Sequence, residues 1–247
     1  MRTIEDYWRD FENFGFIKIS KDGRNDYTLD RTKGSGGFSI LGDPQSAMVT
    51  ISDCTLYQPF IIKEYVSERI IEIGQYYAGA ASVYQKKDHI FEFEYGLNAY
   101  VNLGTFYGYK RIEPNIRLLN IGFAFRENFF SSLPIKLEDN FYERAAMILN
   151  PKPVSIPEIT KICSSINECT LKGNALKLYI RGKSLEVFSL LYDYIYKEKP
   201  KTTNHKKIEN VEKRKGTKKE SSKKNVTPAE KITDSSDENI NSEESST

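Results

Sequence analysis

The chain offers few side chains that could make or break covalent bonds. Only one of its two histidines, His89, lies within the first 200 residues. Cys54 could act as a nucleophile only if the fold brought His89 beside it; otherwise it is a small buried thiol. Glu92 and Glu94 alternate along an apolar run, so they would share one face of a strand, either as an acid and base pair or simply as two solvated side chains. No catalytic constellation follows from these residues.

The motifs of several large enzyme classes are missing from the sequence. It contains no G-x-S-x-G, no G-x-x-x-x-G-K-[ST] and no H-E-x-x-H. Gly34, Gly36 and Gly37 form a short glycine-rich run, but a strand rather than a helix is expected after it, which is typical of a turn and not of a nucleotide loop. The three cysteines form no C-x-x-C pair. We therefore predict no enzyme activity, no metal site and no cofactor. The alternative, an enzyme on a β-barrel, would need a bound metal ion.

Aromatic side chains are the main resource for binding. All 14 Phe, all 16 Tyr and the single Trp lie before residue 201. Such rings can line an apolar pocket, with Tyr hydroxyls to orient a ligand, although most of them must simply pack the core. The candidate ligand-binding residues are Tyr76, Phe91, Phe93, Tyr95, Phe123 and Phe125.

Residues 1–150 show the pattern of many short strands separated by turns, which favours a barrel or a sandwich over a parallel α/β sheet. Within 117–125, the alternate residues from Leu119 to Phe125 are predicted to face the interior, with Asn120 and Gly122 outside. The predicted strands are Phe38–Leu41, Met48–Ser52, Phe60–Val66, Ile70–Tyr77, His89–Tyr95, Ala99–Leu103 and Arg117–Phe125.

Residues 151–199 are predicted to be helical. Ser155 and Glu158 match a capping box and predict a helix that ends near Asn167. A second helix is predicted from Asn174 to Lys199, with apolar residues on two adjoining faces. One face can dock on the β domain, while the other is covered either by a second protein or by the preceding helix. We favour dimerisation, through the candidate residues Tyr179, Leu185, Phe188, Tyr192 and Ile195.

The C-terminal residues 200–247 differ from the rest of a nearly neutral chain, which has 36 basic and 34 acidic residues. Beyond residue 200 there are no aromatic and few apolar residues, so we predict a disordered tail. Its basic part, 201–224, could bind nucleic-acid phosphates without sequence preference, or it could serve only to keep the chain soluble.

The sequence also predicts where the protein resides. No apolar run approaches the roughly 20 residues that span a bilayer, and the charged N-terminus does not resemble a secretory signal. An odd number of unpatterned cysteines fits a reducing compartment. We therefore expect a cytoplasmic protein without membrane contact.

Four segments, in this order, resemble one known family. They are 68–79 (ERIIEIGQYYAG), Gly108-Tyr109 leading through Pro114 into 117–125 (RLLNIGFAF), 126–134 (RENFFSSLP) and 178–191 (LYIRGKSLEVFSLL). With them, residues 27–197 are similar to the N-terminal sensor region of AraC-type transcription regulators, nearest to the siderophore-responsive subgroup.

The resemblance implies a mainly β fold with C-terminal helices: a cupin-like β-barrel that binds a small-molecule effector, followed by helices that pair. The pair would be a homodimer or a heterodimer with related regulators. In the family two helix-turn-helix units follow, and nothing after Lys199 matches them, so specific DNA binding is not expected of this chain. The implied function is a ligand-sensing and dimerisation module. Non-specific nucleic-acid binding through 201–224 is the alternative.

Overall fold

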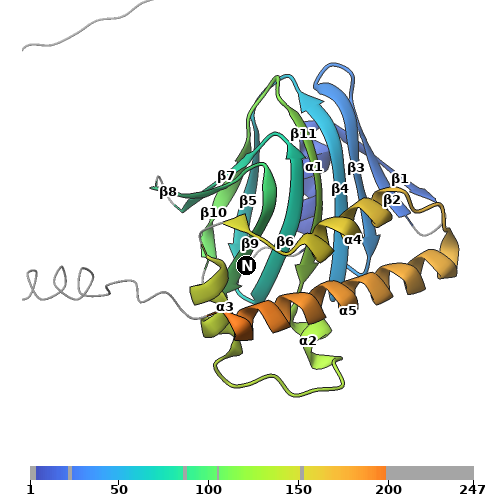
Figure 1. The fold of residues 1–247 in the computed structure, drawn as a ribbon. Coiled ribbons are helices and arrows are strands. Elements are labelled where there is room, and N and C mark those ends of the chain that lie inside the picture. Colours follow the sequence, from blue (N-terminus) through green and yellow to red (C-terminus); the bar gives the residue numbers. More distant parts are fainter. Residues whose placement is uncertain (1–3, 22–23, 86–87, 105, 151–152, 199–247) are drawn as a thin grey trace, which may run out of the picture. The chain divides into compact units, whose positions relative to one another are not determined.

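The computed structural model describes residues 4–21, 24–85, 88–104, 106–150 and 153–198 (Figure 1). The chain divides into two units, residues 1–201 and 202–247. The second unit, with the predicted disordered tail and its basic part 201–224, lies outside the described residues. The expected mainly β fold with C-terminal helices is confirmed.

Within the described residues, the strands form two antiparallel sheets. The large sheet has the order β1-β2-β3-β4-β11-β6-β9-β12, and the small sheet has the order β5-β10-β7-β8. The strands are β1 (Phe16–Lys21), β2 (Arg24–Leu29), β3 (Gly34–Gly42), β4 (Ala47–Leu56), β5 (Phe60–Val66), β6 (Arg69–Ala78), β7 (Ala81–Gln85), β8 (Asp88–Phe93), β9 (Gly96–Leu103), β10 (Phe106–Ile112), β11 (Arg117–Phe125) and β12 (Pro153–Val154).

Each predicted strand coincides with an observed one, except that β8 ends at Phe93 and not at Tyr95. The prediction missed β1, β2, β7, β10 and β12. The glycine run begins β3 and does not form a turn. A Cβ on Gly37 would collide with the backbone oxygen of Tyr27, and one on Gly36 with that of Asp53. Glycine therefore allows the neighbouring strands to approach closely.

The middle of the large sheet is buried on both faces. On β11, Ile121, Phe123 and Phe125 belong to a core shared with the helices. Asn120 and Gly122, which alternate with them, border the space between the two sheets. The prediction that Asn120 and Gly122 face outward is therefore wrong. Alternation shows that a strand has two faces, but it does not show which face meets which neighbour.

The helices are α1 (Ile4–Phe14), α2 (Glu127–Ser131), α3 (Phe141–Leu149), α4 (Pro157–Asn167) and α5 (Gly173–Lys197). Figure 1 shows α4 and α5 crossing the same side of the large sheet, and both contact its strands. The two predicted helices are confirmed, whereas α1, α2 and α3 were not predicted. The capping box is not formed: Ile156 precedes the first turn of α4, and no side chain caps it. Pro157 opens the helix, where its missing N–H costs nothing.

Phe188 of α5 lies at the centre of an aromatic cluster. Its ring centroid is 5.8 Å from that of Phe125, 5.5 Å from Phe129 and 5.4 Å from Phe130. Only 4% of Phe188 is exposed, and Ile195 is fully buried. The assignment of Phe188 and Ile195 to pairing is therefore corrected, because α2 and α3 of the same chain cover the second apolar face of α5.

Replacing Phe188 with alanine tests this burial. We expect Phe188→Ala to lower the free energy of unfolding by about 3–5 kcal/mol, because it removes a buried ring from a packed cluster. The matched control is Lys177→Ala on the same helix, where the side chain is exposed and its loss should cost no more than about 0.5 kcal/mol. Urea denaturation followed by circular dichroism measures both. Equal costs would contradict the placement of Phe188.

Candidate ligand-binding site

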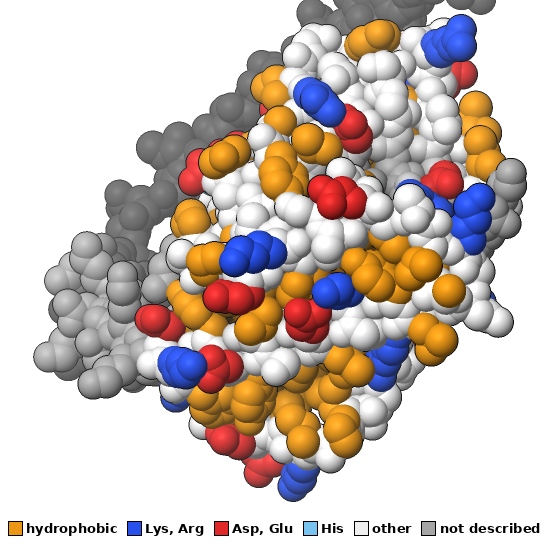
Figure 2. Space-filling view, turned by 45° about the vertical axis from the view of Figure 1, so that its right-hand side comes forward, with side chains coloured by type: hydrophobic (Ala, Val, Ile, Leu, Met, Phe, Trp, Pro, Cys, Tyr) orange, Lys and Arg blue, Asp and Glu red, His pale blue; other side chains and the backbone are white. Residues whose placement is uncertain are grey.

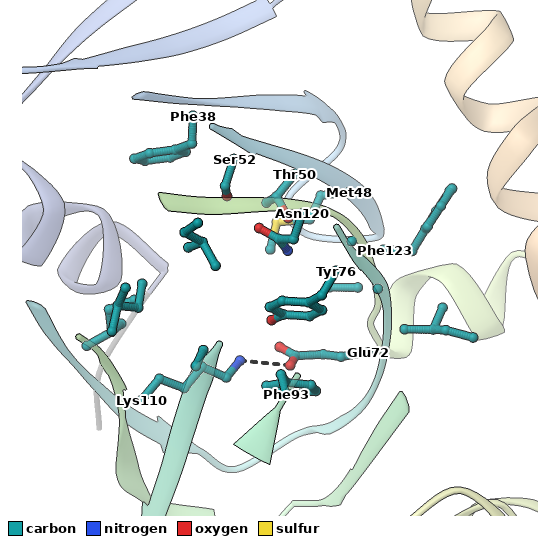
Figure 3. Close-up of a pocket in the computed structure, with 18 of the residues that line it drawn as sticks. Phe38, Met48, Thr50, Ser52, Glu72, Tyr76, Phe93, Lys110, Asn120 and Phe123 are labelled. Carbon is teal, nitrogen blue, oxygen red and sulfur yellow. Dashed lines mark hydrogen bonds and ion pairs between the residues drawn. The ribbon is translucent and has the colours of Figure 1, made fainter. Parts of the chain in front are cut away.

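A cavity of about 140 Å³ lies between the two sheets. Strands of both sheets line it, and Trp8 and Phe11 of α1 border it. An engineered protein cavity of about 150 Å³ binds benzene, so this one has room for about six non-hydrogen atoms. Its apolar lining includes Phe38, Met48, Ile62, Phe93 and Ile112. Its polar lining includes Thr50, Ser52, Glu72, Tyr76, Lys110 and Asn120 (Figure 3).

Three adjacent strands of the large sheet build one wall of this cavity. Ser52 of β4 and Tyr76 of β6 lie on either side of Asn120 of β11. Two residues further along β11, Gly122 lies opposite Gly74 of β6. A Cβ on Gly122 would lie 3.3 Å from Thr50 Oγ1 and 3.7 Å from Asn120 Nδ2, so a side chain here would enter the cavity. The two glycines therefore leave room beside the polar groups.

The side chain of Asn120 is the clearest sign of an unfilled binding position. Asn120 is 8% exposed, and within the described part of the chain nothing hydrogen-bonds to its amide group. Figure 3 shows this amide directed into the cavity, near Ser52 and Tyr76. Because a buried amide without partners costs free energy, a bound molecule that paired with Asn120 would recover some of that cost.

A cluster of three charged groups, one buried and two partly buried, lies at the other side of the cavity. The ammonium group of Lys110 lies 2.7 Å from Glu72 Oε2 and 2.9 Å from Glu64 Oε1. Burial raises the pKa of Glu64, and the ammonium of Lys110 only partly opposes this effect. Two carboxylates share one ammonium, so these three groups carry one negative charge when both carboxylates are ionised. The guanidinium of Arg126, which pairs with Glu68, also acts on Glu64 and lowers its pKa slightly.

Two stacked aromatic rings adjoin the charged cluster. The rings of Tyr76 and Phe93 lie 5.6 Å apart and are nearly parallel, at 5°. The ammonium of Lys110 lies 5.5 Å from the centroid of the Phe93 ring. Burial raises the pKa of Tyr76 and also raises that of Tyr100, to about 12. Both phenols are therefore neutral at pH 7, and each can donate or accept a hydrogen bond.

The structure separates the six candidate ligand-binding residues. Tyr76 and Phe93 line the cavity together. Phe91 is half-buried beside Phe93 and borders a neighbouring hollow. Tyr95 is 77% exposed, because β8 ends before it and the alternation of the strand stops there.

Phe125 is corrected as a pocket residue, whereas Phe123 lines the cavity in part. Both pack in the core shared with the helices, on the opposite face of the large sheet, although part of Phe123 borders the cavity. In Figure 3, Phe123 lies apart from the polar groups of the cavity. The alternation of 117–125 was recognised, and Ile121, Phe123 and Phe125 lie in the core as predicted. The opposite face, with Asn120 and Gly122, is buried as well.

The sequence prediction missed the polar half of the cavity. Glu72 and Asn120 alternate with apolar residues in strands that were predicted, so the signal for an opposite face was present. A strand face exposed to solvent has the same alternating pattern as a face that lines a cavity. The sequence of the strand alone does not distinguish them, because the difference depends on what packs on each face of the sheet. Lys110 lies in β10, which was not predicted at all.

The residues considered for covalent chemistry lie elsewhere. Burial and the neighbouring Asp53 raise the pKa of the Cys54 thiol to about 11, so it is protonated at pH 7. His89 contacts the ring of Tyr84 on the small sheet. Among the described residues, no group of three or more His, Cys, Asp or Glu side chains is arranged to hold a metal ion. No helix in the same part of the chain is both long enough and apolar enough to span a membrane.

The comparison with protein families identifies the chain. Residues 46–207, more than half of its length, match the family model described as the regulatory protein PchR N-terminal domain. The chain belongs to this family. The match confirms the resemblance to the sensor region of siderophore-type AraC regulators and makes this protein a regulatory N-terminal domain. No curated protein sequence gives a significant match to the chain.

Solved structures similar to this member of the PchR N-terminal domain family include the AraC-like transcriptional activator CuxR, with a TM-score of 0.46 and 10% identity over 81% of this chain and 68% of the other. KdgF from Halomonas sp. has a TM-score of 0.27 and 14% identity, over 45% of this chain and 91% of that one. Tomato vicilin has a TM-score of 0.28 and 16% identity, over 38% of this chain and 29% of that one.

Replacing Lys110 with a neutral residue tests whether the charged cluster is shielded from water. We expect Lys110→Met to lower the free energy of unfolding at pH 8 by about 3–5 kcal/mol, because the buried Glu64 and the partly buried Glu72 lose their counter-charge. The cost should shrink at pH 5. A carboxyl group whose pKa is raised by folding binds more protons in the folded state than in the unfolded state. The free energy of unfolding therefore falls as the pH rises through the pKa of that group.

The control for this prediction is Arg111→Met on the same strand. Arg111 pairs with Glu113, and both side chains are more than a third exposed, so its loss should cost no more than about 1 kcal/mol. Urea denaturation at both pH values gives the comparison. A pH-independent cost for Lys110→Met would contradict the burial of the cluster.

Proposed function

We propose that this regulatory domain senses a small molecule in the cavity between its sheets and transmits binding through its C-terminal helices, without covalent chemistry. The observation that carries the proposal is the cavity itself, where the buried Asn120 amide has no partner in the described structure. Membership in a family of regulatory domains supports a sensing role over a catalytic one.

The same strands that line the cavity also hold the helices. Thr160 of α4 donates a hydrogen bond of 2.8 Å to Gln75 of β6, whose neighbour Tyr76 lines the cavity. On β11, Asn120 faces the cavity while Phe125 contacts Phe188 of α5. A ligand that moves these strands changes the surface on which α4 and α5 pack. Binding can therefore shift the balance between two helix arrangements.

We propose that α5 carries the signal to a second chain through its exposed side. Leu178 is 75% exposed and Leu185 is 38% exposed, and a Cβ on Gly182 would meet nothing within 4 Å. At spacings of four and three residues, these positions share one face of the helix. Figure 2 turns the N-terminal end of α5 toward the viewer and shows groups of hydrophobic side chains between charged ones.

The other pairing candidates are less available to a partner. Tyr179 is partly buried and donates a hydrogen bond of 3.1 Å to the backbone oxygen of Ser165 in α4. Tyr192 is partly buried and stacks on Phe141 of α3. Leu185 is thus the sequence candidate that best fits pairing.

Ligand binding in the cavity is tested by filling it. Native mass spectrometry of the full chain purified from its host should show a bound small molecule. Gly122→Val extends a side chain toward Thr50 and Asn120. In this variant the fraction of protein that carries the small molecule should fall by at least nine-tenths. The matched control is Ser35→Val at an exposed position of β3, which should retain the molecule. Equal retention by both variants would refute the site.

Self-association through α5 is tested by charging its exposed face. Sedimentation velocity should show that Leu178→Asp with Leu185→Asp weakens dimerisation at least tenfold, because two desolvated carboxylates would face the partner. Lys177→Glu gives the same change in net charge on a neighbouring exposed position and should leave association unchanged. If the double variant associates as the unchanged chain does, this face does not pair.

A further inference from the structure

The charges around the cavity indicate the chemical class of its ligand. We infer that the site takes a small organic cation, an alkylammonium or a comparable amine of about six non-hydrogen atoms. This inference rests on the proposed sensing function and adds a statement about the ligand.

The first reason is the sign of the buried charge. Glu64 and Glu72 both contact the single ammonium of Lys110, at 2.9 and 2.7 Å, and Glu72 and Lys110 line the cavity. Lys110 is thus already shared between two carboxylates. An anionic ligand beside it would also lie close to Glu72, which lines the cavity, and a low local dielectric strengthens that repulsion. A cation would instead balance the excess negative charge of the cluster.

The second reason is independent of the acidic groups. More than nine-tenths of Asn120 is buried, its amide is directed into the cavity, and no described residue pairs with it. Its amide oxygen can accept a hydrogen bond from an N–H donor. The Thr50 and Ser52 hydroxyls also line the cavity and can accept further ones. An ammonium group, which has three donors and no acceptor, matches this set.

The third reason is the aromatic wall. The faces of aromatic rings attract cations, and this attraction grows when water is excluded. Tyr76 and Phe93 stack beside Glu72, and the ammonium of Lys110 already lies 5.5 Å from the Phe93 centroid. The alkyl part of the ligand would contact Met48 and Phe38 on the opposite side.

Three probes of similar size and different charge test the inference. Isothermal titration calorimetry on the full chain should show that n-butylammonium binds at least tenfold more tightly than n-butanol, and that butyrate does not bind. Glu72→Gln should weaken n-butylammonium binding at least tenfold and change n-butanol binding by less than twofold. Glu113→Gln, which alters an exposed carboxylate paired with Arg111, is the matched control and should change neither.

A second measurement does not depend on how well Glu72→Gln folds. In the unchanged chain, the affinity for n-butylammonium should rise with pH, because Glu64, whose pKa is raised by burial, must lose its proton for the full charge to form. The affinity for n-butanol should stay constant over the same range.

The outcomes separate this inference from the proposed function. If n-butanol or butyrate binds as tightly as n-butylammonium, the cationic class is wrong while the cavity remains a binding site. If the affinity for n-butylammonium does not depend on Glu72 or on pH, the charged cluster is purely structural and the inference fails. If no probe binds and Gly122→Val retains the co-purified molecule, the proposed function fails as well.

Discussion

The arrangement of this domain depends on one constraint: the middle of its large sheet is buried on both faces. The helices bury one face through residues such as Ile121, Phe123 and Phe125, and the small sheet lies over the other. A sheet in this position must supply two sets of side chains that fit different neighbours. On the helix side the set is bulky and apolar. On the cavity side it includes glycine, asparagine, threonine and serine, which leave space and supply hydrogen-bonding groups.

The buried charges follow from the same arrangement. Glu72 faces the cavity from the large sheet, and Lys110 reaches it from the small one, so their ion pair joins the two layers. Breaking a buried ion pair leaves a charge without its partner, and this penalty is larger than the net stabilisation that the pair provides. The pair therefore helps to fix how the sheets are placed, and it keeps two charged side chains at the wall of the cavity.

The sequence was sufficient for the mainly β fold, for most central strands and for the two long C-terminal helices, because each has a clear apolar period. It was not sufficient for α2 and α3, which are short, or for β10, which carries few apolar residues that alternate. Their absence from the prediction led to the two main errors. Without α2 and α3, the second apolar face of α5 suggested a partner chain, and Phe188 was assigned to pairing. Without knowledge of what covers each face, Phe125 was assigned to the pocket and Asn120 was not.

The opposed glycines, Gly74 and Gly122, have a consequence for the evolution of such domains. Neither has a positive φ, so no backbone strain requires glycine at these positions, and residues with side chains are conformationally acceptable there. A methyl group on Gly122 would lie 3.3 Å from Thr50 Oγ1 and take up space in the cavity. One on Gly74 would lie 3.3 Å from the Cα of Gly122 and 3.5 Å from the Tyr76 ring, so the neighbouring strand would have to shift slightly. Single substitutions at Gly122 in related domains could therefore change the volume of this cavity, while the packing of the helices on the opposite face of the sheet stayed the same.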